Sequence, residues 1–262
     1  MTDIGIWIDG PVPSEAQIPA WADEIASTGA SLASLWCVGD PLHLPRWGGR
    51  ALLLATKALR ARGLVVRWTI WGDSRPAKIE EQRAAWAQIV PAFWAAGEPL
   101  AEIEVDLEEA WRDPAGATLL AQELGTLGLT ITACNSVPGP KVSKAVRAVL
   151  DLPGVEEWTL QAYSQYTEKE WTHDPLVRPV TFQAYAAKFA QPLLEAGIVA
   201  RWRCGLITIN QAHPAPHPRG IAALDAAADE ALRHTDLLCL WSWKHLRTQE
   251  AVLDWVLGLA RV

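Results

Sequence analysis

Residues 101–111 read Ala-Glu-Ile-Glu-Val-Asp-Leu-Glu-Glu-Ala-Trp, an alternation of apolar and acidic side chains that is typical of a strand. Successive side chains of a strand point to opposite faces, so Glu104, Asp106 and Glu108 share one face while the intervening Ile, Val and Leu face an apolar layer. Packing alone would not select a row of carboxylates. Like charges this close raise the pKa of at least one carboxyl group, which keeps it protonated for general acid catalysis near neutral pH.

The acidic row also has a structural interpretation. Arg67 and Arg203 fall in neighbouring predicted strands, and their guanidinium groups could neutralise the acids. In that case the carboxylates would belong to the core and would have no catalytic role.

The composition limits the classes of protein. A chain of 262 residues, 50% of them hydrophobic, can bury a large core, and α/β barrels of this length form one domain, which we expect to span residues 1–262. A net charge of -7 provides no basic surface for a phosphate backbone, so no nucleic acid partner is expected. No apolar run approaches the roughly twenty residues of a membrane span, so no membrane association is expected either.

Apolar runs and helix-forming segments alternate along the whole chain. Strand-like runs occupy residues 4–9, 31–38, 64–72, 101–108, 129–135, 158–165, 200–209 and 237–243. Segments rich in Ala, Leu, Glu and Arg occupy residues 14–27, 50–62, 79–96, 116–124, 142–150, 182–196, 221–233 and 249–259. Eight such pairs predict an α/β fold, a single (β/α)8 TIM barrel, over an open doubly wound sheet. No phosphate-binding glycine loop follows the first run, which also argues against the open sheet.

Glycine follows several of the predicted helices, just before the next strand. The positions are Gly29, Gly63, Gly97, Gly128 and Gly197. This placement is typical of the left-handed residue that ends a helix in an αβ turn.

A barrel of this kind has its chemistry at the C-terminal ends of its strands. Besides Asp106 and Glu108 on the fourth strand, this rule selects polar and aromatic residues on other strands: Asp9, Trp71, Asn135, Gln161, Tyr163 and Trp241. The chain has fifteen Trp against three Phe and three Tyr. Flat aromatic faces stack on sugar rings, so this excess favours a carbohydrate ligand.

Four motifs resemble the family-18 glycoside hydrolases, especially the compact chitinase-lysozymes. Glu104-Val-Asp106-Leu-Glu108 is similar to their Asp-x-Asp-x-Glu pattern at its last two acids, with Glu104 in place of the first Asp. The other three motifs follow in the expected order: Leu-Thr-Ile-Thr-Ala at residues 129–133, Gln161-Ala-Tyr163, and Leu240-Trp241-Ser242. The third strand ends in Thr-Ile-Trp-Gly where the family has Ser-x-Gly-Gly.

The resemblance implies hydrolysis of a β-1,4 bond next to an N-acetylglucosamine unit, whose own N-acetyl oxygen attacks the anomeric carbon. Glu108 would be the general acid, Asp106 would steady the developing positive charge, and Tyr163 would hydrogen-bond the acetamido carbonyl. Substrate-binding roles are assigned to Asp9, Trp71, Glu104, Asn135, Gln161 and Trp241. No cofactor or metal is expected. His213 and His217 stand four apart, but the prolines between them exclude the helix that would align them as zinc ligands.

Three alternatives stay open. The family-25 lysozymes also resemble this chain, through Asp9, Asp106 and Glu108, although Trp241 stands where that family has an acidic residue on the eighth strand. A metal-dependent barrel enzyme would use Glu104, Asp106 and Glu108 as ligands of a hard divalent cation. A non-catalytic carbohydrate-binding barrel of a phage or lysin would keep the aromatic groove without a competent acid.

The N-terminus lacks the basic-then-apolar pattern of a signal peptide, which predicts synthesis in the cytoplasm. Four cysteines in apolar runs, without metal-ligand spacing, indicate free thiols in a reducing compartment: Cys37, Cys134, Cys204 and Cys239. A phage-encoded protein that acts on the cell wall would look the same. We expect a monomer whose partner is a polysaccharide. Chitin and peptidoglycan, internal and terminal cleavage, and retention and inversion all stay open.

Overall fold

Eight parallel strands close into a barrel in the computed structural model, which describes residues 2–9, 13–38, 49–70, 76–99, 102–106, 114–126, 128, 130–136, 155–161, 187, 190–207 and 220–261. The strands are β1 (Asp3–Ile8), β2 (Leu32–Val38), β3 (Val65–Ile70), β4 (Glu102–Asp106), β5 (Thr130–Ser136), β6 (Val155–Gln161), β7 (Arg201–Ile207) and β8 (Leu237–Trp241). Each strand pairs with the next, and β8 closes the ring by pairing Leu237 with Asp3 of β1. The predicted (β/α)8 TIM barrel is confirmed.

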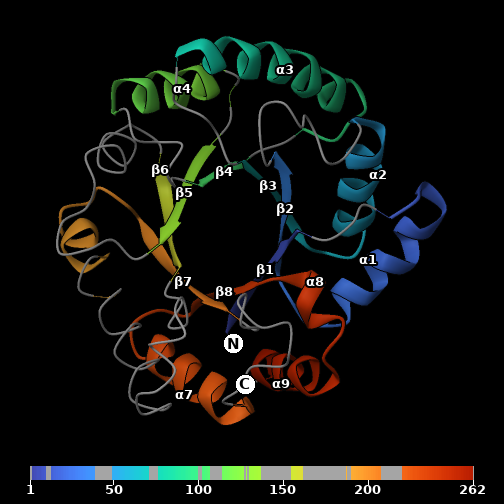
Figure 1. Ribbon diagram of the computed structural model, residues 1–262, viewed down its shortest axis with the longest axis vertical. Coiled ribbons are helices and arrows are strands. Elements are labelled where there is room, and N and C mark those ends of the chain that lie inside the picture. The colour runs from blue at the N-terminus through green and yellow to red at the C-terminus, as the bar shows by residue number, and fades with distance from the viewer. Residues whose placement is uncertain are drawn as a thin grey trace.

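Helices surround the ring of strands (Figure 1). They are α1 (Ile18–Ala26), preceded by a 3-10 turn at Glu15–Gln17, then α2 (Gly49–Arg60), α3 (Pro76–Ala95), α4 (Pro114–Thr126), α7 (Gly220–Leu232), α8 (Trp243–Leu246) and α9 (Glu250–Arg261). The helix predicted at 142–150 lies outside the described residues, and that predicted at 182–196 is described only in part, with residues 190–195 helical. None of the helices in the described part of the chain has the length and apolarity that crossing a membrane requires.

The predicted eighth strand extends too far at its C-terminal end. Extended backbone was expected to reach Trp243, but β8 ends at Trp241 and α8 begins at Trp243. The pattern of apolar residues does not reveal where the strand ends and the helix begins, because Trp243 is buried in α8 just as it would be in a strand.

The five glycines after the predicted helices all adopt positive φ, between 65° and 85°: Gly29, Gly63, Gly97, Gly128 and Gly197. Side chains disfavour this region, so glycine is the residue that lets the chain turn from a helix into the next strand. The prediction of left-handed helix ends is confirmed.

The outer face of the barrel is apolar and packs against the helices. On β4 this face consists of Ile103 and Val105, as the alternation of residues 101–108 predicts. Trp68 of β3 is fully buried on the same face, where its ring meets Phe93 of α3 edge to face with centroids 4.5 Å apart. These contacts form the main hydrophobic core.

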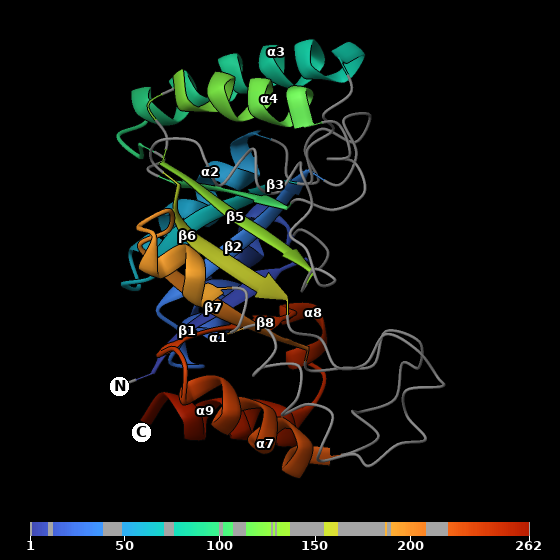
Figure 2. The same ribbon diagram turned by 90° about the vertical axis from the view of Figure 1, so that its left-hand side faces the viewer.

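The inner face of the barrel carries the polar side chains of the strands, with one layer at each end and Glu104 between them. The base layer, near the N-terminal ends of the strands, consists of Asp3, Arg67, Glu102, Glu157 and Arg203. The mouth layer, near the C-terminal ends, consists of Trp36, Asp106, Cys134, Gln161 and Trp241. Figure 2 shows the arrowheads of β5 and β6 pointing away from the side on which both chain ends lie.

Candidate active site

Glu104 lies in the middle of the barrel, between the two layers. It is 1% exposed, and its Oε2 accepts hydrogen bonds from Trp7 Nε1 at 2.6 Å, Thr69 Oγ1 at 2.8 Å and Ser34 Oγ at 3.2 Å. Thr159 Oγ1 donates to Oε1 at 3.3 Å. The carboxylate is therefore held by donors from β1, β2, β3 and β6, and the prediction that it binds substrate stays untested.

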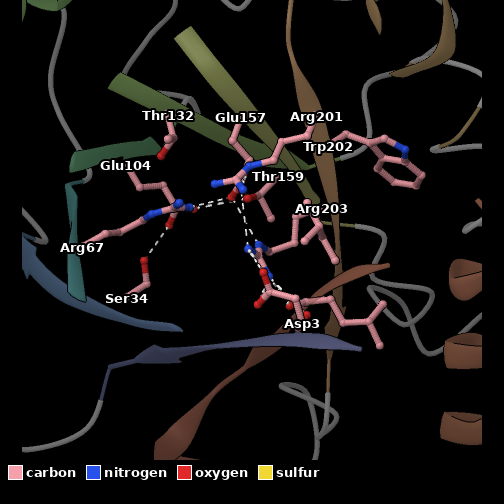
Figure 3. Close-up of polar contacts among 12 residues, drawn as sticks. Asp3, Ser34, Arg67, Glu104, Thr132, Glu157, Thr159, Arg201, Trp202 and Arg203 are labelled. Carbon is pink, nitrogen blue, oxygen red and sulfur yellow. Dashed lines mark hydrogen bonds and ion pairs between the residues drawn. The ribbon is translucent and has the colours of Figure 1, made fainter. Parts of the chain in front are cut away.

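The base layer is a network of buried ion pairs centred on Glu157. Arg67 and Arg203 approach this carboxylate from different sides (Figure 3), at 2.7 Å and 3.2 Å. Arg67 also pairs with Glu102 at 2.7 Å and lies 3.6 Å from Glu104. The structural interpretation of the arginines is thus correct in part, because their main partner is Glu157 of β6 rather than the acidic row of β4.

The pKa of Glu157 shows how strongly the base layer holds its charge. Burial raises this pKa, but the charges and hydrogen bonds of Arg67 and Arg203 outweigh burial and bring it to about 2. For Arg67 the directions are reversed: burial lowers its pKa, but the facing carboxylates, Glu157 first, outweigh burial and raise the pKa above its usual value. Glu157, Arg67 and Arg203 all stay ionised at neutral pH. The base layer is therefore a set of opposite charges that attract one another.

Asp106 ends β4 in the mouth layer, where its carboxylate is completely buried. Gln161, the last residue of β6, donates from Nε2 to Asp106 Oδ1 at 3.3 Å. Cys134 of β5 lies beside both residues, with its Sγ 3.9 Å from Gln161 Nε2. Burial first, and the nearby charge of Asp106 second, raise the pKa of the Cys134 thiol, which favours its protonated form at neutral pH.

Three tryptophans form a continuous aromatic cluster, two members of which, Trp7 and Trp241, pack with Cys134. Trp241 of β8 is partly exposed and contacts Trp7 edge to face, with centroids 5.9 Å apart. Trp241 also meets Trp36 of β2, likewise partly exposed, at 5.1 Å. The cluster runs from the interior of the barrel to the ends of β2 and β8.

Three predicted site residues lie outside the described part of the chain: Trp71, Glu108 and Tyr163. His213 and His217 do so too. Asn135 lies on β5 one residue after Cys134, with its side chain outside the description, and Asp9 follows β1 half-buried. The structure therefore brings together Glu104, Asp106, Gln161 and Trp241 of the predicted set, and the roles of the others stay predictions.

Sequence reasoning missed three residues of this interior: Glu157, Trp7 and Trp36. Glu157 was not predicted because the sixth strand was expected to begin at Trp158, whereas β6 begins at Val155. Its signal was the alternation of Glu157, Thr159 and Gln161 with two apolar residues. Trp7 and Trp36 lie in strands that look apolar on both faces, so alternation gave no signal there.

A metal centre has little support in the described residues. Within them, no group of three or more His, Cys, Asp or Glu side chains is placed to hold an ion. Glu104, one of the three ligands that the metal-dependent alternative requires, accepts three hydrogen bonds at Oε2 and has an arginine facing Oε1. These donors occupy the lone pairs that a cation would need.

No protein-family model matches this chain, and no curated protein matches it. Several solved structures match it over nearly their whole length. ICChI chitinase from Ipomoea carnea is 14% identical with a TM-score of 0.58, covering 98% of this chain and 99% of that one. The C-terminal domain of a putative chitinase from Desulfitobacterium hafniense DCB-2 is 12% identical with a TM-score of 0.64, covering 99% of each. A GH113 β-1,4-mannanase is 7% identical with a TM-score of 0.66, covering 99% and 98%. The shared feature is the fold.

Proposed function

We propose that this protein is a glycoside hydrolase that cleaves β-1,4 bonds in an N-acetylglucosamine-containing polysaccharide, either peptidoglycan or chitin. The observation that carries the proposal is the contact of Gln161 Nε2 with Asp106 Oδ1 at 3.3 Å. These residues, 55 positions apart, come from two of the motifs that resemble family 18, and they meet at the end of the barrel where such folds place their chemistry. Trp241 belongs to a third of those motifs and lies at the same end.

Each residue has a chemical role in this proposal. Glu108 follows Asp106 by two positions, so continued extended backbone would turn its carboxyl group to the same face, where it protonates the leaving glycosidic oxygen. The N-acetyl oxygen of the sugar attacks the anomeric carbon, and Asp106 stabilises the positive charge that develops on the acetamido nitrogen. Gln161 and Tyr163 bind the acetamido group, and Trp241 stacks on the apolar face of the sugar.

The fold likeness supports the proposal without specifying the substrate. Chitinases and a mannanase share this barrel over nearly the whole chain. All three names describe enzymes of polysaccharide breakdown, and the partly exposed indoles of Trp36 and Trp241 suit a carbohydrate.

Product analysis tests the proposal. The protein is incubated with purified peptidoglycan and with N-acetylglucosamine oligomers, and new reducing ends are identified by mass spectrometry. We expect cleavage of one of the two, with muramic acid ends indicating a lysozyme and glucosamine ends a chitinase or glucosaminidase. A saccharide that binds and is never cut would instead favour the non-catalytic barrel, and cleavage that EDTA abolishes would favour the metal-dependent one.

A further inference from the structure

Trp7 lies between the two layers of the barrel interior and is held at both edges of its ring. Its indole is fully buried, and its Nε1 donates to Glu104 Oε2 at 2.6 Å. The far edge of the ring lies against the backbone of β7 at Gly205, where a Cβ atom would come within 3.0 Å of Trp7 Cη2. A hydrogen bond at one edge and a glycine at the other fix the plane of this ring.

Trp241 contacts Trp7 across the pair of strands β1 and β8. The two residues are register partners on the adjacent strands β1 and β8, and their rings meet at an interplanar angle of 62°. Trp36 also contacts Trp241, at an interplanar angle of 76°. Trp241 therefore contacts one completely buried indole and one partly exposed indole.

We propose that Trp7 is a positioning residue that orients the Trp241 ring for a bound saccharide, and that Glu104 acts as the anchor of Trp7. The inference rests on the proposed function, since it takes the ligand of Trp241 to be a sugar. It gives Glu104 a role that differs from the predicted one, because its carboxylate holds an indole and does not touch the saccharide. The order of contacts is Glu104, Trp7, Trp241, sugar.

The role follows from the chemistry of stacking. A pyranose presents one flat apolar face, and its contact with an indole depends on the two planes being parallel. A ring free to rotate loses part of its binding energy in becoming ordered, whereas a ring already fixed does not. Glu104 can fix the Trp7 ring because its own carboxylate is fixed: Ser34 and Thr69 donate hydrogen bonds to it, and Arg67 pairs with it.

The test is a double-mutant cycle with two readouts. Trp7→Phe removes the Nε1 donor and part of the ring, Trp241→Phe removes the proposed sugar platform, and the double variant completes the cycle. Circular dichroism of the coupled indoles reports on ring orientation in the free protein, and calorimetric titration with an N-acetylglucosamine tetramer reports on binding. Trp68→Phe is the matched control, because it removes an equally buried indole from the outer face of the barrel.

We expect the circular dichroism change caused by Trp241→Phe to be smaller in the Trp7→Phe background than in the wild type. We also expect Trp7→Phe to weaken tetramer binding roughly three- to tenfold, the range that a lost aromatic pair gives, while Trp68→Phe leaves binding unchanged. If Trp7→Phe does not fold, Glu104→Gln is the second variant, since it disturbs the anchor and keeps all three indoles. It should weaken binding in the same direction.

The outcomes separate this inference from the proposed function. Additive circular dichroism changes, or tetramer binding that neither Trp7→Phe nor Glu104→Gln weakens, would overturn the positioning role and leave the proposed function standing. A wild-type protein that binds no saccharide would overturn the proposed function and the saccharide part of this inference together.

Discussion

The base layer and the mouth layer share one barrel interior but differ in what their polar groups contact. In the base layer, Glu157 pairs with Arg67 and Arg203, which are at most 2% exposed, and also with Arg201 at 2.8 Å, so its charge is balanced within the protein. In the mouth layer a carboxylate, an amide and a thiol contact one another, and the indoles of Trp36 and Trp241 are partly exposed. The base therefore pairs its buried charges within the protein, whereas the mouth keeps aromatic side chains partly exposed to solvent.

The largest expected effect comes from the mouth, at Glu108. Replacing this residue by Gln removes the proton that the leaving oxygen needs, and general acid catalysis is worth roughly a hundred- to ten-thousand-fold in rate. We therefore expect Glu108→Gln to lower the rate of reducing-end release by at least about a hundredfold, while the protein still binds the oligosaccharide. Normal turnover in this variant would exclude Glu108 as the acid.

The next largest effect belongs to the base. Glu157→Gln leaves Arg67 and Arg203 facing each other without their shared carboxylate. Breaking a buried ion pair by removing one partner costs about 3–5 kcal/mol, so we expect a loss of that size in the free energy of unfolding, measured with urea. A loss below about 1 kcal/mol, typical of an exposed pair, would show that the base layer does not stabilise the barrel.

The pH dependence of stability isolates the same carboxylate. The pKa of Glu157 is about 2 in the folded protein against 4.5 as its usual value, so its contribution is fully present above pH 4.5 and is lost as the pH falls toward 2. This shift corresponds to roughly 3 kcal/mol. We expect the unfolding free energy of the wild type to fall over this interval more steeply than that of Glu157→Gln. Parallel curves would contradict the assignment.

The smallest effect is expected on the outside of the barrel. Arg50 pairs with Glu15 at 2.8 Å, but these side chains are 79% and 49% exposed. Exposed pairs contribute about 0–1 kcal/mol, so Arg50→Ala should hardly change the urea midpoint. This variant is the control for Glu157→Gln, and a comparable loss in both would remove the distinction between buried and exposed charge.

Much of the fold could be predicted because local signals and tertiary structure agree. Each glycine predicted to end a helix has positive φ, and the alternation around Asp106 places acids inside and Ile103 and Val105 outside. Both signals depend on the backbone of a few neighbouring residues, which sequence alone reports well.

The candidate site was less predictable because its contacts join distant strands. The bond from Trp7 to Glu104 spans 97 positions, and no local pattern indicates it. Trp7 alternates with isoleucines in β1, so its inward direction is hidden in an apolar run. Predicting the position of Glu157 required knowing the exact first residue of β6, and the ends of a strand are what sequence patterns locate least well.

The most direct test of the central claim, that a saccharide binds at the mouth layer, is hydroxyl-radical footprinting read by mass spectrometry with and without an N-acetylglucosamine tetramer. Trp94 on α3 is 57% exposed on the outside of the barrel and provides the internal reference. The account predicts that the tetramer lowers oxidation of Trp36 and Trp241 and leaves Trp94 unchanged. Equal oxidation of Trp241 in both samples, or protection of Trp94 alone, would contradict it.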